Sequence, residues 1–411
     1  MTNHQISTGH EGSVKDQING YFQKIKSGDM GVLPAIAALI VLLGIFTAFS
    51  PALFLSDINI ANLFVQAAEL TMLAVAMVFV ILLAEIDLSA GVTGGVAMAI
   101  FFRLYQANWN WVLALVLSIA VGAAIGALIG FFVAKIGVPS FVVTLGLYLG
   151  FQGLQLVMLG EGGLFKVDIP EIGAIMNQNL EPYQGWGLLV IVILVSAAIS
   201  MSDRIRRRNK GLPNRPIALL YGKLALMGIL GVLFVSLLNA NRSQGVIPIQ
   251  GVPVVIPITI AILFIGTFML QRTRFGRHLY AVGGNPEAAR RAGIKVAKIR
   301  IISFVLCSSL AVVSGLFHVS RLGAVEATAG RQIVLNGVAA AVVGGVSLFG
   351  GRGGLVHAAI GAMVITVIAN GLGLIGWDAG SNFLVTGGVL ILAATVDALS
   401  RKRGASGQIR T

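Results

Sequence analysis

Long apolar stretches, separated by short polar segments, fill most of this 411-residue chain. A helix of about 20 residues crosses the roughly 30 Å hydrocarbon core of a bilayer, and most of the stretches have about that length. They predict an all-α, polytopic transmembrane bundle of about 12 helices. Two glycine-rich segments, 88–105 and 333–349, are alternatively re-entrant, which lowers the count to about ten. The predicted segments are 32–50, 64–84, 88–105, 111–134, 140–159, 185–201, 217–238, 253–270, 300–322, 333–349, 354–374 and 380–398.

Basic residues between these segments predict the sidedness of the chain. Lysine and arginine gather in three places, and each of them follows an even number of predicted crossings. The positive-inside rule then places these basic segments and both termini in the cytoplasm. The predicted organisation is a cytoplasmic segment 1–31, a transmembrane domain 32–398 with an extracytoplasmic loop 160–184 and cytoplasmic loops 202–216 and 271–299, and a basic cytoplasmic tail 399–411.

Composition supports a membrane protein and argues against several other classes. The chain is 56% hydrophobic and 11% charged, whereas soluble domains are about 25% charged. The net charge of +13 would suit nucleic acid, but the basic residues lie in short loops between apolar runs, so no nucleic-acid partner is expected. The single cysteine, Cys307, excludes an internal disulfide, and the five histidines show no metal-ligand spacing.

Glycine recurs at four-residue spacing along several predicted helices. Such spacing places small residues in a strip on which another helix backbone can approach closely. The tandem Gly122, Gly126 and Gly130 predicts a packing seam, and Gly146 with Gly150 repeats the spacing. The alternative is the general enrichment of glycine in membrane helices.

No motif in the chain predicts nucleotide binding. The sequence lacks the G-x-x-x-x-G-K-[ST] phosphate-binding loop, so any use of ATP requires another subunit. A G-x-G-x-x-G match from Gly371 to Gly376 ends a membrane helix and follows no strand, so it is not a dinucleotide site.

A short segment within the loop 271–299 predicts a capped helix outside the membrane. Asn285 is a good N-cap, Pro286 suits the first helical position, and Gly293 can adopt the left-handed conformation that ends a helix. Glu287 complements the positive end of the helix dipole. We interpret the element as a rigid docking knob; a solvated basic loop is the alternative.

The same residues resemble a known coupling signature. Glu287-Ala288-Ala289 followed by Gly293 resembles the E-A-A-x-x-x-G loop of ABC importer permeases, whose helix fits a cleft on the ATPase subunit. The segments Arg272–Asn285, Ala84–Ser89, Val138–Leu145 and Val343–Gly351 are similar to those of the monosaccharide (ribose, xylose and arabinose) permeases, and the arginine-rich insert 204–210 resembles their xylose-type members.

The resemblance implies a set of partners. The permeases of this family are homodimers in the bacterial inner membrane, served by an ABC ATPase that uses ATP and Mg and by an extracytoplasmic sugar-binding protein. The chain itself is expected to hold no cofactor and to catalyse no reaction. It departs from the family at Val334, where a carboxylate is common, and this leaves the identity of the sugar open.

Polar residues within the apolar segments are the candidates for the pathway or gate, because ionised groups are costly there. Glu85, Asp87 and Ser89 are alternatively interfacial residues that cap the next helix, and each uncharged candidate is alternatively a packing residue. The candidates are Glu69, Glu85, Asp87, Ser89, Thr144, Gln152, Asn370 and Trp377.

Three functions are compatible with a chain of this kind. The first is the permease of an ABC sugar importer, best matched to D-xylose or a related sugar. The second is an ion-coupled secondary transporter of a small polar solute, for which a midplane carboxylate such as Glu69 would be required. The third is a membrane enzyme acting on lipid-linked substrates, for which only Glu85 with Asp87 comes close to an acidic cluster.

Overall fold

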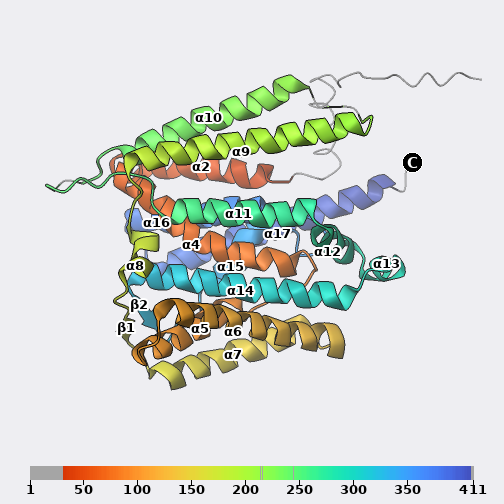
Figure 1. Cartoon of the computed structure of the whole chain (residues 1–411), viewed down its shortest axis with the longest axis horizontal. Coiled ribbons are helices and arrows are strands. Elements are labelled where there is room, and N and C mark those ends of the chain that lie inside the picture. The colour runs from red at the N-terminus through yellow and green to blue at the C-terminus, as the bar shows by residue number, and fades with distance from the viewer. Residues whose placement is uncertain (1–30, 213, 215, 244, 409–411) are drawn as a thin grey trace, which may run out of the picture. The chain divides into compact units, whose positions relative to one another are not determined.

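The structure is a computed structural model that describes residues 31–212, 214, 216–243 and 245–408 (Figure 1). The predicted cytoplasmic segment lies outside these residues except for Gly31, and so do the side chains of the basic tail. The described chain divides into two compact units. The larger unit combines Gly31–Gln178 with Pro253–Leu399, and the smaller one is centred on Asn179–Val252.

The larger unit is helical apart from two short strands. Each predicted apolar segment of this unit contains a helix, but several polar segments are also ordered into short helices. The elements of its first part are α2 (Leu33–Phe49), α3 (Pro51–Phe54), α4 (Asp57–Ile81), α5 (Ala90–Gln106), α6 (Trp111–Phe131), the π-helix η1 (Phe132–Ile136), α7 (Ser140–Leu159), β1 (Leu164–Lys166) and α8 (Pro170–Asn177). Those of its second part are α11 (Val255–Arg272), α12 (Arg274–Gly284), α13 (Pro286–Arg291), α14 (Val296–Leu322), β2 (Ala324–Glu326), α15 (Ile333–Val343), α16 (Leu355–Leu374) and α17 (Ala379–Gln408).

The smaller unit is a hairpin of α9 (Pro182–Asn209) and α10 (Ile217–Asn239). A capping box starts α9, with the Gln184 side chain accepting from the Glu181 backbone amide at 3.0 Å. The basic residues 204–208, predicted to lie in a loop, instead form the last turns of this helix. Basic side chains favour that position because they complement the negative end of the helix dipole.

The predicted count of about 12 membrane helices is not confirmed. Within the described ranges, nine helices are long and apolar enough to cross a membrane. The predicted segments without such a helix are 32–50, 88–105 and 333–349, which hold α2, α5 and α15. Helices α2 and α5 have 17 residues each. Helix α15 has 11 residues and is therefore about 16 Å long, well short of a bilayer core.

Helix α4 forms the core of the larger unit. It is apolar on all sides, which is typical of a helix surrounded by others, and every residue from Ala67 to Leu83 is buried. Helices α14, α15 and α16 all pack against it. Ser56 caps its N-terminus by accepting from the Asn59 amide at 3.4 Å.

The two ends of the larger unit carry different short elements (Figure 1). At one end, α12 and α13 lie together outside the long helices. At the other end, β1 and β2 form an antiparallel pair in which Phe165 is opposite Val325, and α8 lies beside them. The loop 160–184 therefore contributes a strand and a helix that its sequence did not indicate.

Candidate functional site

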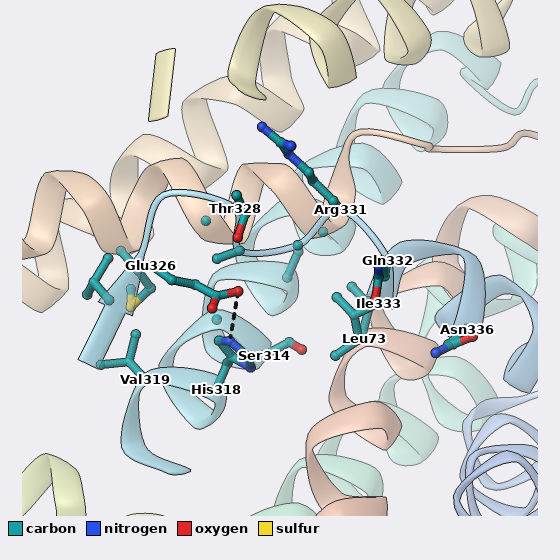
Figure 2. Close-up of a pocket in the computed structure, with 18 residues that line it drawn as sticks. Leu73, Ser314, His318, Val319, Glu326, Thr328, Arg331, Gln332, Ile333 and Asn336 are labelled. Carbon is teal, nitrogen blue, oxygen red and sulfur yellow. Dashed lines mark ion pairs between the residues drawn. The ribbon is translucent and has the colours of Figure 1, made fainter. Parts of the chain in front are cut away.

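A cavity of about 530 Å³ lies within the larger unit. Its walls come from the second half of α14, the start of α5, the segment from Val325 to Gln332, the start of α15, and Leu73 of α4. Figure 2 shows Glu326, His318 and Ser314 gathered on one side, with Gln332, Ile333 and Asn336 together on the other. The cavity is thus lined by polar and apolar groups that belong to segments far apart in the sequence.

Glycines of α5 allow the irregular segment to close one wall of the cavity. A Cβ atom at Gly95 would lie 2.7 Å from the carbonyl oxygen of Ala329, and one at Gly91 would collide with the carbonyl of Gly330. Gly330 itself has a φ of +87°, a conformation that favours glycine. The irregular backbone is tolerated beside membrane helices because it lines a cavity instead of facing lipid.

A network of charged side chains stands behind this wall. The buried Glu69 of α4 pairs with two groups of α14: Oε1 lies 2.8 Å from His318 Nδ1, and Oε2 accepts from the Arg321 guanidinium at 2.8 Å. The Nε2 atom of His318 lies 3.7 Å from Glu326 Oε1 across the cavity wall (Figure 2). The Nδ1 atom of His318 is therefore bonded to Glu69, and its Nε2 atom faces the cavity.

Of the predicted pathway residues, Glu69 is the one that the structure brings next to the cavity, through His318. Glu85, Asp87 and Ser89 lie instead in the linker 82–89 between α4 and α5. Glu85 forms an ion pair with Arg300 at the start of α14, at 3.4 Å.

The linker 82–89 is held by side-chain hydrogen bonds within itself and to α7. Asp87 is fully buried, and its Oδ1 accepts from both the amide and the hydroxyl of Ser89, at 2.9 and 2.6 Å, just before α5 begins. Thr144, another predicted pathway residue, donates to the carbonyl of Ile86 at 3.3 Å, and Ser140 accepts from the Ile86 amide at 3.3 Å. These contacts tie the linker to α7, and Ser89, the N-cap residue of α5, makes no side-chain cap hydrogen bond to the helix.

The other predicted pathway residues lie away from the cavity. Asn370 of α16 exchanges two amide hydrogen bonds with Asn59 of α4, at 2.9 and 3.1 Å. Gln152 is half-buried on α7. Trp377 follows α16 and is 55% exposed. The structure does not bring these three side chains together.

The short element predicted from the loop 271–299 is present as α13. Asn285 is its N-cap and accepts from the amides of Glu287 and Ala288 at 3.0 and 2.9 Å. Glu287 pairs with Arg290 and Arg291 at 3.2 and 3.4 Å, and Gly293 has a φ of +81°. The predicted caps at both ends are confirmed, and the Glu287 side chain remains mostly exposed.

Helix α12 connects α13 to the interior through close backbone contacts. A Cβ atom at Gly283 would collide with the carbonyl of Leu82 and lie 2.9 Å from the Gly351 amide nitrogen. The Gly351 amide donates to the same Leu82 carbonyl at 2.9 Å. Tyr280 donates to the Gly353 carbonyl at 2.8 Å, and burial raises the pKa of its hydroxyl, which keeps it protonated. The α12–α13 element therefore rests directly on the linker that begins α5.

The predicted glycine seam lies where α6 meets α14. A Cβ atom at Gly126 would lie 2.7 Å from Val305 Cα, and one at Gly130 would lie 2.7 Å from Ile301 Cα. At Gly122 the added atom would meet the Val312 side chain and lie 3.2 Å from the Ser308 carbonyl. The two backbones approach as closely as glycine permits.

The charged residues that line the cavity, His318, Glu326 and Arg331, were not predicted from the sequence, and neither was Arg321, which pairs with Glu69 behind the wall. Their signal was present in the sequence, since a histidine and an arginine three residues apart end a long apolar segment and an acid follows shortly after. An ionisable group in such a segment needs a partner. Counting possible partners for Glu69 would have identified His318 and Arg321.

The larger unit combines a bundle of membrane-length helices with a polar internal cavity and a capped helix displayed at one end. Residues 59–394 match the family model described as a branched-chain amino acid transport system / permease component. The chain belongs to this family and is a transport subunit.

Its relatives are named for sugars. The chain is 34% identical over 389 residues to the xylose transport system permease protein of Escherichia coli (strain K12), covering 94% of this chain and 96% of that protein. It is 32% identical over 382 residues to the xylose permease protein of Haemophilus influenzae (strain ATCC 51907 / DSM 11121 / KW20 / Rd), covering 92% and 99%. It is 31% identical over 363 residues to the ribose import permease protein of E. coli K12, covering 88% and 92%. No solved structure matches the chain.

Proposed function

We propose that the chain is the permease of an ABC importer and carries D-xylose or a closely related monosaccharide. The observation that supports this most strongly is similarity to xylose permeases along almost the whole of both chains. The family description names branched-chain amino acids, but the individual relatives are named for pentoses, and the polar cavity suits a sugar. The chain is a multi-pass protein of the bacterial inner membrane.

In this proposal, α13 is the docking element for a separate ATPase. The helix is short, capped at both ends and exposed, and α12 connects it by backbone contacts to the linker before α5. The coupling residues are Asn285, Pro286, Glu287, Ala288, Ala289 and Gly293. ATP and Mg²⁺ are bound by the ATPase, and this chain contributes the pathway.

Docking of a cytoplasmic ATPase on α13 also fixes which end of the permease faces the cytoplasm in this proposal. The α13 end and both termini are cytoplasmic, where the basic loops belong. The opposite end, with β1, β2 and α8, then faces a soluble sugar-binding protein that delivers the cargo.

The permease works as a homodimer in this proposal, and α7 supports it. Gly146, Gly150 and Gly153 share an exposed face of α7 on which an added Cβ would meet no described atom within 4 Å. Leu149 and Val157 beside them are 63% and 84% exposed. A glycine face gives little packing against lipid but allows close approach of another helix, so it is a suitable contact for a second copy.

Reconstitution tests the proposed function. Proteoliposomes holding the permease with its ATPase are expected to import labelled D-xylose when ATP and the binding protein are supplied. They are expected to import none when the ATPase, the ATP or the binding protein is omitted. Uptake by the permease alone, driven by a proton or sodium gradient, would instead establish the secondary transporter. The pairing of Glu69 with His318 and Arg321 disfavours that alternative, because the carboxylate already has its partners.

Two variants test the docking role of α13. Glu287→Lys reverses the charge at the N-terminus of α13, and Gly293→Pro is incompatible with the φ of +81° at its end. Both are expected to lose ATPase co-purification and ATP-driven uptake while the permease still inserts and folds. Glu161→Lys, an exposed charge reversal in the loop 160–184, is the matched control for ATPase binding. Normal co-purification with both α13 variants would disprove the docking role.

A further inference from the structure

We propose that the cavity is a transient binding site for a neutral sugar within the permease, with Glu326, Thr328 and Asn336 as direct contacts. This inference rests on the proposed function and adds a specific site to it. It requires the permease itself to recognise cargo, in addition to any recognition by a delivering protein.

The cavity has the dimensions and lining of a small-molecule site. Its volume of about 530 Å³ falls within the roughly 300–1,000 Å³ that is usual for ligand pockets. Apolar side chains such as Leu73, Met98 and Ile333 contribute wall area for the C–H faces of a sugar ring, and polar side chains stand on both sides of them.

Several lining groups have hydrogen-bonding capacity that the protein does not use. Within the part of the chain that the structure describes, the side chains of Thr328, Gln332 and Asn336 make no hydrogen bond. The buried Nε2 of His318 also lacks a hydrogen-bond partner among the described residues. Together they offer a hydroxyl, two amides and a ring nitrogen, which are the donors and acceptors that bind sugar hydroxyls.

The charges around the cavity are balanced, which favours a neutral ligand. The cavity and the ion-pair network behind it include two carboxylates, Glu69 and Glu326, and two guanidinium groups, Arg321 and Arg331. These four charges cancel when the His318 imidazole, which lies between the two carboxylates, is neutral. An ion entering this cavity would find no excess charge of the opposite sign. A sugar hydroxyl can donate to the Glu326 carboxylate, a charge-assisted hydrogen bond stronger than a neutral one.

Glu69 is a positioning residue in this site. It lies behind the wall and touches the cavity only through His318 Nδ1, so it fixes the ring and directs Nε2 towards Glu326. The sugar contact itself is expected to be weak, because a transporter must release its cargo as readily as it accepts it.

Binding of sugars to the full-length permease alone tests the site. The purified permease in lipid nanodiscs, without ATPase or binding protein, is expected to bind one of a panel of labelled neutral pentoses and hexoses saturably in a scintillation proximity assay. Glu326→Gln and the near-isosteric Asn336→Leu are each expected to weaken binding about tenfold, because each variant loses or weakens one hydrogen bond to the sugar. Asp168→Asn, which removes a carboxylate that is 80% exposed outside the cavity, is expected to bind as the wild type does.

Further measurements distinguish the positioning residue Glu69 from the direct contact Glu326. They also distinguish failure of the sugar site from failure of the proposed import function. Glu69→Gln keeps a hydrogen-bonding side chain behind His318 and is expected to lose less affinity than Glu326→Gln. Absence of saturable binding to folded wild type, unchanged binding in both cavity variants, or binding that requires sodium would each overturn the sugar site. ATP-driven import without permease binding would reject this site alone, and binding without import would reject the proposed function alone.

Discussion

Helices α6 and α7 carry glycines at the same four-residue spacing but use them differently. On α6, Gly122, Gly126 and Gly130 are buried against α14, where an added Cβ would meet the neighbouring helix. On α7, Gly146 and Gly150 face outwards, and an added Cβ would meet no described atom within 4 Å. Four-residue glycine spacing therefore predicts a helix face on which another helix can pack closely. It does not predict which helix packs there.

The α6 and α7 glycines have different surroundings because the two helices turn different faces towards the rest of the chain. Helix α7 uses its other face within the chain: Thr144 binds the linker 82–89, and Gln155 donates to the Val92 carbonyl at 3.4 Å. On its glycine face, an added Cβ at Gly146 or Gly150 would meet no described atom within 4 Å. Helix α6 places its glycines towards α14 and leaves larger residues such as Leu113 and Val116 exposed.

The largest effect is expected for Gly126→Leu. The new side chain would enter the space occupied by the α14 backbone at Phe304 and Val305, and backbone cannot move aside as a side chain can. We expect a destabilisation of about 3 kcal/mol or more, seen as poor folding and a large drop in melting temperature in detergent. A melting temperature equal to the wild type would show that the α6–α14 contact is not tight.

Gly150→Leu makes the same chemical change on α7 and is expected to separate assembly from folding. The permease should keep its wild-type melting temperature as a monomer, because the added side chain has open space. It should lose the dimer in mass photometry of nanodiscs, and with it ATP-driven transport. A dimer of undiminished stability would place the interface on another face.

Gly122→Ala is expected to have a moderate effect. The added methyl group would collide with Cγ2 of Val312, a side-chain atom, and lie 3.2 Å from the Ser308 carbonyl oxygen. We expect a loss of about 1 to 2 kcal/mol, typical of overpacking by one methyl group. Gly126→Ala is the comparison and should be worse, since its methyl group meets backbone.

Gly146→Ala is expected to have the smallest effect. Alanine is about 0.5 to 1 kcal/mol more favourable than glycine within a helix, and nothing in the described chain opposes it at this position. The monomer should be unchanged or slightly more stable in thermal unfolding. A clear destabilisation of the isolated monomer would mean that this face packs against part of the same chain.

The sequence predicted the helices more completely than it predicted the site. Every apolar segment contains a helix, because a backbone in lipid must satisfy its hydrogen bonds internally. The caps of α13 were predictable because Asn285, Pro286 and Gly293 act on their own neighbours in the chain. For 333–349 the sequence left a membrane-spanning and a re-entrant segment open, and it did not predict that α15 ends at Val343, since the glycines that follow continue the apolar pattern.

The cavity depended on contacts that no local pattern encodes. Glu69 meets His318 across 249 positions of sequence, and its candidacy rested only on the cost of a charge in an apolar segment. Asp87 is also a carboxylic acid, yet it accepts hydrogen bonds from Ser89 in the linker before α5 and does not line the cavity. Which acid reaches the cavity is decided by the packing of α4 against α14, and this packing is a tertiary property.

The contact between Gly283 and Leu82 has a consequence for how such permeases diversify. The contact lies between α12 and the linker 82–89 and is made by backbone atoms, so it imposes almost no requirement on the side chains of the neighbouring α13. The exposed residues Glu287, Arg290 and Arg291 are therefore free to vary with the partner that they meet. Under the proposed docking role, exchange of a few surface residues of α13 would be enough to fit this permease to a different ATPase, while the backbone contact between α12 and the linker stays the same.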